Sequence, residues 1–250
     1  MVGRPTASAL VQRGHQVATL SRSGSAGPAG TEALQGDLTT GAGLERALDG
    51  VDCVVDVANI TTGSRAKAVR YFTDTTHRLG RLGEAAGVKH HLVLSIVGVD
   101  RVPLGYFAGK VAQEQTVAAG PLPWTILRAT QFHEFVGQTM DQYKIGRLAL
   151  VPNMSGQPVA AAEVGARLAE IVEAGPSGRV PDLAGPRLER LPDLARQLNR
   201  ARDLHRTVIP LPVPGATGRA MRAGGQLPGP GAVLRGPTFG DWLATSPNPA

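Results

Sequence analysis

The chain has 250 residues, of which 42% are hydrophobic, 18% charged and 4% aromatic, and its formal net charge is +6. This length and composition predict a globular protein with one domain, or one domain and a small lobe, and argue against a disordered chain. No apolar run approaches the roughly 18 residues of a membrane-spanning helix and no secretory signal is visible, so we expect a cytoplasmic protein that does not contact membranes.

The positive charge is concentrated towards the C-terminus, where residues 176–250 hold ten arginines and five acidic residues. A basic chain can indicate a nucleic-acid partner. These arginines, however, are scattered, without a helix-turn-helix pattern, a zinc signature or interleaved aromatic residues. We therefore predict a solvated basic surface and no nucleic-acid partner, although an anionic ligand such as a phosphorylated cofactor is compatible with it.

The first part of the chain alternates predicted helices and strands. Hydrophobic periodicity and glycine stops predict helices at 6–13, 42–48 and 65–86 and strands at 16–20, 31–35 and 51–58. The single cysteine, Cys53, lies in the last of these strands, cannot form an internal disulfide and is expected to be a buried thiol in a reducing compartment.

A continuous apolar strand is predicted at 91–97, followed by a loop and a helix that opens near Tyr106. Tyr106 and Lys110 are four residues apart and therefore share one face of this helix. A nearby ammonium lowers the pKa of a phenol, and a hydroxyl such as that of Ser95 can hold a carbonyl oxygen. This favours a catalytic Tyr/Lys/Ser set, and the alternative is a surface Tyr and Lys on an amphipathic helix.

The remaining elements are shorter. We predict strands at 123–129, 148–151, 181–184 and 207–209 and helices at 161–173, 191–199, 216–224 and 238–244. His133 follows a strand and is expected to be structural. His90 and His91 have no partners at metal-ligand spacing, so we predict no metal site.

Three motifs carry a resemblance to a known family. Residues 95–100 read SIVGVD, Tyr106-x-x-x-Lys110 and Glu114 follow, and residues 122–132 read LPWTILRATQF. Together they resemble the atypical short-chain dehydrogenase/reductases, in particular the NmrA-like NAD(P)H-binding proteins. The resemblance implies an α/β fold with a Rossmann-type doubly wound parallel sheet and helices on both faces. It also implies an NAD(P)-binding domain over residues 1–145 and a small substrate lobe over residues 146–250.

The beginning of the chain departs from this family. A Rossmann domain opens with a strand and a glycine-rich turn before its first helix, whereas here the sequence enters a helix almost directly. By the resemblance, Gly3 is the last glycine of that turn, and we expect the first strand and the earlier glycines to be missing. The alternative is that Gly3 belongs to a flexible terminus.

The resemblance also places cofactor contacts. After strand 16–20 come Ser21 and Arg22, with no acid for a ribose 2′-hydroxyl, and Arg22 could pair with a 2′-phosphate; this favours NADP, with NAD possible. Asp37 and Leu38 match residues that lie against the adenine, although Asp37 could equally be a turn residue. The remaining expected contacts are Ala58, Asn59, Lys110 and Thr130.

We therefore expect an NADP-dependent oxidoreductase that acts on a small carbonyl or enone substrate, as a monomer or homodimer. Tyr106 would transfer a proton, Lys110 would lower its pKa and bind the ribose, and Ser95 would orient the carbonyl. Members of the family differ in whether they keep catalysis, so the first alternative is an NADP(H)-binding redox sensor without turnover. Further alternatives are a sugar-nucleotide epimerase or dehydratase, and a chain that has lost cofactor binding.

Overall fold

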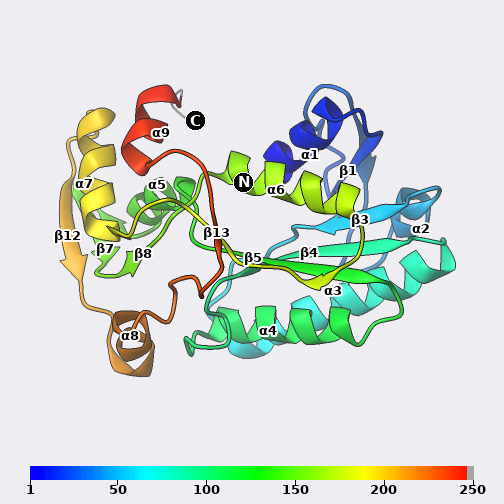
Figure 1. Ribbon diagram of the computed structural model, residues 1–250. Coiled ribbons are helices and arrows are strands. Elements are labelled where there is room, and N and C mark those ends of the chain that lie inside the picture. Colours follow the sequence, from blue (N-terminus) through cyan, green and yellow to red (C-terminus); the bar gives the residue numbers. More distant parts are fainter. Residues whose placement is uncertain (247–250) are drawn as a thin grey trace. The chain divides into compact units, whose positions relative to one another are not determined.

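The computed structural model describes residues 1–246, which form two compact units (Figure 1). Unit 1 comprises residues 1–95, 104–128 and 164–180, and the rest of the described chain forms unit 2. This division differs from the expected consecutive domains, 1–145 and 146–250. The difference arises because the chain passes between the units several times, so that residues 164–180 belong to unit 1 and residues 129–145 to unit 2.

A parallel sheet forms the centre of unit 1. It contains, in spatial order, β3 (Cys53–Asp56), β4 (His90–Ile96), β5 (Trp124–Ala129) and β9 (Gly178–Arg179). Ile96 and Ala129, the last residues of β4 and β5, are counted with unit 2. The uncharged run of β4 is buried along nearly its whole length, as its sequence predicts for a strand covered on both faces.

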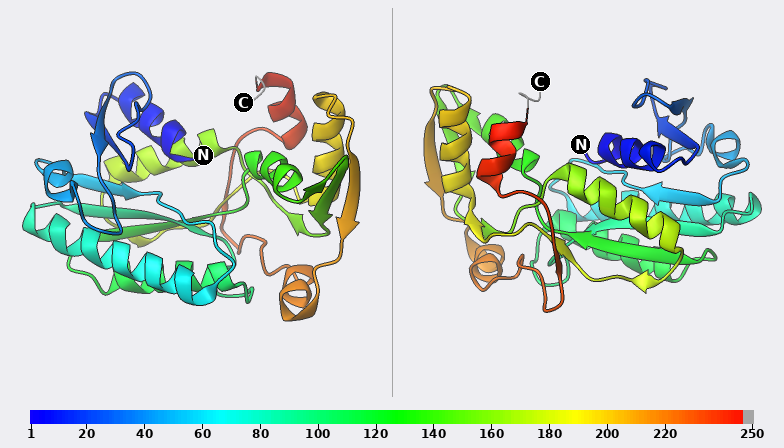
Figure 2. Two further views of the ribbon diagram at one scale, coloured as in Figure 1. Left: turned by 180° about the vertical axis from the view of Figure 1, so that it is seen from behind. Right: turned by 45° about the horizontal axis from the view of Figure 1, so that its top comes forward.

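Helices cover both faces of this sheet. α3 (Arg65–Ala85) and α4 (Gly105–Ala118) pack together on one face, and α6 (Ala161–Ala174) lies over the other with α1 (Gly3–Gln12) against it (Figures 1 and 2). Gly109 permits the close approach of α3 and α4, because a Cβ there would lie 2.7 Å from the Cβ of Ala68. The predicted α/β fold with a mainly parallel sheet flanked by helices is confirmed.

The sheet structure of unit 1 is divided into two separate ladders. β1 (Val17–Ser21) and β2 (Thr31–Gln35) pair in parallel with each other and are followed by the short helix α2 (Leu44–Leu48). Within residues 1–246, neither strand pairs with β3. Val54 and Val55 of β3 are accordingly only half-buried.

Unit 2 is built from shorter elements around its own core. Its helices are α5 (Glu134–Gln142), α7 (Leu191–Ala201), α8 (Gly215–Arg222) and α9 (Phe239–Thr245). β12 (Thr207–Leu211), β7 (Leu148–Pro152) and β6 (Lys144–Ile145) form one sheet, β8 (Ser155–Gly156) pairs with β11 (Glu189–Arg190), and β10 (Leu183–Ala184) pairs with β13 (Val233–Leu234). The core between these elements includes Met140, Leu194, Phe239 and Trp242.

The environment of His133 and the character of the helices can be compared with the expectations from the sequence. His133 is buried in the core of unit 2, with ring centroids 5.4 Å from Phe239 and 5.3 Å from Trp242, which is the structural role expected of it. No helix within residues 1–246 combines the length and the apolar character needed to cross a membrane.

Candidate functional site

Two of the predicted catalytic and cofactor positions lie where strands of unit 1 end, and a third lies at the start of the helix that follows β4. Asn59 follows β3, Ser95 stands near the end of β4, and Tyr106 lies in the first turn of α4. In parallel α/β sheets, ligands bind outside the carboxyl ends of the strands. Gly105 allows α4 to begin close to the loop before α3, because a Cβ at this position would lie 2.8 Å from the carbonyl oxygen of Gly63.

The Tyr106 side chain is held by Asn59. Its hydroxyl donates a hydrogen bond to Asn59 Oδ1 over 2.6 Å, and its ring packs edge-on against Phe72 with a centroid distance of 5.8 Å. Burial raises the pKa of Tyr106 to about 12, and the neighbouring Tyr71 adds to this shift. The expectation that Lys110 lowers the pKa of Tyr106 is therefore wrong, because burial dominates the environment of this phenol.

Lys110 lies one turn further along α4 and is only 4% exposed. Its ammonium donates to the carbonyl oxygen of Leu94 over 2.6 Å and to Gln113 Oε1, and it lies 4.8 Å from the centroid of the Phe72 ring. Burial lowers the pKa of Lys110 to about 8, and the opposing charges of Asp56 and Glu114 limit the fall.

A buried acid that the sequence analysis did not single out lies beside this lysine. Asp56, the last residue of β3, accepts a hydrogen bond from Gln113 Nε2 at 2.8 Å and one from the backbone N–H of Ala58 at 3.0 Å. His91 Nε2 lies 3.9 Å from its carboxylate. An acid inside the apolar run 51–58 was the signal that could have identified this position, since buried carboxylates need partners.

Ser95 offers an unsatisfied polar atom. It is 2% exposed, and its Oγ has no hydrogen-bond partner among residues 1–246. Buried hydroxyl groups are normally paired, so a lone one near the end of a strand is suited to an oxygen of a bound molecule.

The expected nucleotide contacts at the start of unit 1 lie on α1, at the last residue of β1 and directly after it. Gly3 is the first residue of α1, and a Cβ there would be 3.5 Å from Val57 Cγ2, so the alternative of a flexible terminus is wrong. The Ser21 hydroxyl accepts from the backbone N–H of Ser25 at 3.2 Å, and Arg22 is exposed. An exposed guanidinium directly after a strand is accessible to a phosphate.

Asp37 and Leu38 have local roles in the structure. Asp37 Oδ1 accepts hydrogen bonds from the backbone N–H and the hydroxyl of Thr39, at 2.7 and 2.6 Å, and these bonds lower the pKa of Asp37. This is the geometry of the turn alternative. Leu38 packs against a small apolar cluster around Leu44 and Leu48. Adenine contacts at both positions remain predictions.

Thr130 belongs to unit 2. Its hydroxyl donates to the carbonyl oxygen of Gln157 over 2.6 Å, and its side chain is 2% exposed. The hydroxyl is thus already engaged within unit 2, and the expected cofactor contact of Thr130 remains a prediction.

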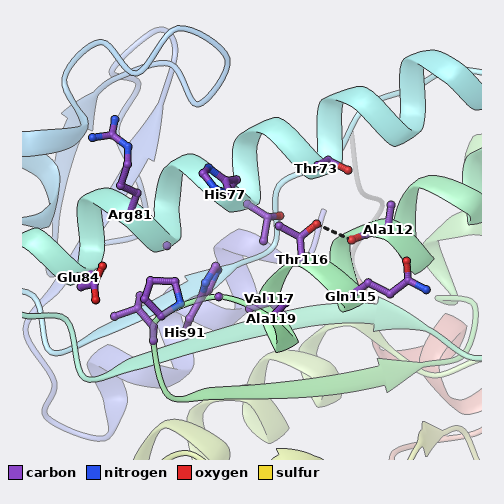
Figure 3. Close-up of a pocket in the computed structure, with 15 residues that line it drawn as sticks. Thr73, His77, Arg81, Glu84, His91, Ala112, Gln115, Thr116, Val117 and Ala119 are labelled. Carbon is purple, nitrogen blue, oxygen red and sulfur yellow. Dashed lines mark hydrogen bonds between the residues drawn. The ribbon is translucent and has the colours of Figure 1, made fainter.

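A cavity of about 710 Å³ lies between α3 and α4 (Figure 3). Its walls include His77 and Arg81 of α3 and Gln115 and Thr116 of α4. His91, near the start of β4, also lines it, so the cavity is at the opposite end of the strand from Ser95. None of the predicted site residues contributes to its lining.

Residues 1–174 match the model of a family described as NAD(P)H-binding. The chain belongs to this NAD(P)H-binding family. This confirms the NAD(P)H-binding family that the resemblance implied. A comparison with curated proteins found no match.

Solved structures with the same fold include other NAD(P)-dependent proteins. This member of the NAD(P)H-binding family is similar to an NADPH-dependent quinone oxidoreductase (QOR2) from Escherichia coli, complexed with NADPH. The two share 19% identity over 98% of this chain and 95% of that one, with a TM-score of 0.73. It is also similar to a short-chain dehydrogenase/reductase superfamily protein from Agrobacterium tumefaciens with bound NAD (17% identity, 98% and 92% coverage, TM-score 0.66).

A further similar structure is TunA, an NAD-dependent NDP-hexosamine 5,6-dehydratase involved in tunicamycin biosynthesis. It shares 15% identity over 98% of this chain and 92% of that one, with a TM-score of 0.72. At these identities the likeness concerns the fold of this NAD(P)H-binding protein, and the chemistry has to be argued from its own side chains.

Proposed function

We propose that this protein is an NADP(H)-dependent oxidoreductase that reduces a small carbonyl or enone compound. The observation that carries the proposal is the Tyr106 phenol, which is held by Asn59 one helical turn from the buried Lys110. Membership of the NAD(P)H-binding family supports the cofactor, and an NADPH-dependent quinone oxidoreductase with the same fold makes quinones and enones the first substrates to test.

The protonation state of Tyr106 favours one direction of reaction. With its pKa raised to about 12, the phenol keeps its proton throughout the neutral range. It is therefore suited to donating a proton to a substrate oxygen that gains negative charge, and poorly suited to removing a proton from an alcohol. The bond to Asn59 Oδ1 holds the hydroxyl in place before substrate binds.

The other two catalytic positions would orient the ligands. Ser95 Oγ lacks a partner within residues 1–246, and in this proposal it would donate to the substrate oxygen. An ammonium group carries three N–H donors, and two of those on Lys110 are engaged by Leu94 and Gln113. The third would bind a ribose hydroxyl of the cofactor. When bound, the nicotinamide supplies the hydride.

The start of α1 and the residue after β1, Arg22, are suited to the phosphate groups of a dinucleotide. The first turn of α1 has no acidic residue and its N-cap, Val2, makes no side-chain hydrogen bond, so the first backbone N–H groups of this helix can bind the pyrophosphate. Arg22 would pair with the 2′-phosphate through its planar guanidinium, which favours NADP over NAD.

A second candidate function is binding of NADP(H) without turnover, as in a redox sensor. Two observations on Tyr106 and Lys110 favour it. The pKa of Tyr106 is raised and not lowered, and the Lys110 ammonium donates to Leu94 and Gln113. The third candidate, a sugar-nucleotide epimerase or dehydratase, is supported by the similarity to TunA, whose described activity is of this class.

One experiment separates these functions. Binding of NADPH and NADH to the full chain is measured by calorimetry, and NADPH oxidation is followed with a panel of quinones and enones. Tyr106→Phe is compared with Tyr71→Phe, a matched removal of a hydroxyl from a half-buried tyrosine of α3.

A reductase requires that Tyr106→Phe lowers kcat by roughly a hundredfold or more while the Kd for NADPH stays unchanged, with Tyr71→Phe close to wild type. NADPH binding without turnover on any substrate would favour the sensor. Absence of binding to either nucleotide would overturn both proposals.

A further inference from the structure

Asp56 is a buried carboxylate whose role the proposed reaction does not explain. It is 5% exposed and ends β3. An ionised carboxylate in a protein interior is unfavourable unless other groups compensate its charge and satisfy its oxygens. Burial by itself raises the pKa of Asp56, but the positive charges of His91 and Lys110 and the hydrogen bond from the backbone N–H of Ala58 outweigh it, so the net pKa of Asp56 is lowered and the acid is ionised at neutral pH.

One carboxylate oxygen of Asp56 is connected to Lys110 by hydrogen bonds through Gln113. Gln113 Nε2 donates to Asp56 Oδ2 over 2.8 Å, and Gln113 Oε1 accepts from the Lys110 ammonium. The ammonium has only donors and the ionised carboxylate only acceptors, so the amide between them can take just one orientation. The amide thereby links a buried positive and a buried negative charge that do not touch directly.

The other carboxylate oxygen of Asp56 is connected to Tyr106 through the backbone of Ala58 and the side chain of Asn59. Asp56 Oδ1 accepts from the backbone N–H of Ala58 over 3.0 Å. This bond fixes the chain immediately before Asn59, whose Oδ1 accepts from the Tyr106 hydroxyl. The two halves of the proposed Tyr/Lys pair therefore depend on the two oxygens of one acid.

We propose that Asp56 is a positioning residue that, through Gln113 and Ala58, sets the location and charge of Lys110 and the location of Tyr106. This inference rests on the proposed function for its catalytic meaning, but the effect on Lys110 can be tested without cofactor or substrate. It assigns a role to two residues, Asp56 and Gln113, that lie outside the expected catalytic set.

Few other charges face this cluster. On β4, His91 lies 3.9 Å from Asp56. On α3, burial and then the negative charge of Asp56 raise the pKa of Tyr71. Glu114 also raises the pKa of Lys110, but its carboxylate is bound by Arg128 at two points. Asp56 is the larger of the two acidic influences on Lys110. Removing its charge should therefore make Lys110 lose its proton at a lower pH.

The chain contains four lysines, at 67, 89, 110 and 144, so lysine-selective carbon-13 labelling gives a nuclear magnetic resonance spectrum with four side-chain signals. Lys110→Met identifies the signal of Lys110 by its loss. We expect this signal to titrate near pH 8 in the wild type and about one pH unit or more lower in Asp56→Asn. If the proposed function holds, the pH above which turnover declines should fall by the same amount.

Asp52→Asn is the matched control. It removes a carboxylate near the start of the same strand, but this acid is exposed and pairs with Lys89 over 2.7 Å. It should alter the titration of Lys89 and leave that of Lys110 unchanged. Should Asp56→Asn fail to fold, Gln113→Met breaks the same link with a side chain of similar size, and the Lys110 midpoint should again move down.

An unchanged Lys110 midpoint in either folded variant overturns the proposal, whatever the protein catalyses. A shifted midpoint in a protein without reductase activity would keep the assignment of Asp56 and count only against the proposed function. A shift in Asp52→Asn as large as in Asp56→Asn would show a general electrostatic effect and would also overturn it.

Discussion

The guanidinium of Arg128 binds both carboxylate oxygens of Glu114, over 2.8 and 2.6 Å, and thereby ties the end of β5 to α4. Both side chains are nearly buried, at 7% and 12% exposure. A two-point ion pair of this kind is far more sensitive to loss of one partner than an exposed pair, because the remaining charge stays buried without compensation.

We therefore expect Arg128→Met to lower the free energy of unfolding by about 3 kcal/mol or more, measured by urea denaturation at neutral pH. The exposed pair of Lys89 and Asp52 provides the comparison, and Lys89→Met should leave the unfolding midpoint almost unchanged. Equal effects of the two substitutions would contradict the importance of burial at Glu114.

Lys110 should make stability depend on pH. Burial lowers its pKa to about 8 from the ordinary value of 10.5, so the unfolded chain binds more protons than the folded chain between these values. The contribution of Lys110 to the free energy of unfolding must then rise as pH increases through this window. Below it, the burial of an ammonium counts fully against the folded state.

Comparison with Lys110→Met isolates this effect. The difference in unfolding free energy between the two proteins should move in favour of the wild type by roughly 2 kcal/mol from about pH 7 to about pH 10. The same comparison with Lys89→Met should be flat, because Lys89 donates a hydrogen bond to Asp52, which raises the pKa of Lys89 and places its titration above this window. A flat difference for Lys110 would mean that its pKa is not lowered.

Arg22→Ser tests the choice of nucleotide. Loss of a charged hydrogen bond to the 2′-phosphate should weaken NADPH binding by about tenfold and leave NADH binding unchanged. Arg46→Ser, at an exposed position of α2, is the control for the loss of one positive charge. If both variants weaken NADPH binding equally, the effect comes from net charge and not from a contact of Arg22.

Cys53 should be an inert thiol in the folded chain. It is the single cysteine, lies in β3, and burial raises its pKa to about 12. Reaction with a disulfide reagent requires the thiolate, so the native rate at mildly alkaline pH should be at least roughly a hundredfold below the rate in denaturant. Comparable rates in both conditions would indicate that β3 is accessible in the native state.

Long elements with a clear apolar period could be predicted from the sequence. The predicted helix at 65–86 is α3. The predicted helix at 161–173 is α6, in which Val164, Leu168 and Ile171 recur at helical spacing and are buried. α5 was not predicted, since Gly137 and the β-branched Thr139 lie inside it and weaken its helical signal. Its stability comes instead from burying Val136 and Met140 in the core of unit 2.

The candidate site could be predicted only in part. Spacing along one helix places Tyr106 and Lys110 on a common face, and this required no knowledge of the fold. The direction of the Lys110 ammonium depends on Asp56, which lies on β3 and not on α4. The pKa of Tyr106 depends on burial by side chains of α3. Such effects arise from contacts between residues far apart in the sequence, which periodicity does not report.

The division of the strands of unit 1 into two ladders has a consequence for how a bound nucleotide would leave. β1 and β2 share five residue pairs with each other and none with β3 among the described residues. A two-stranded ladder is weak on its own, so its opening need not disturb the larger sheet. Ser21, the last residue of β1, and Arg22 directly after it can then lose their local order in a fluctuation much smaller than global unfolding. The lifetime of a phosphate contact at this end would be set by local fraying and not by the stability of the whole protein.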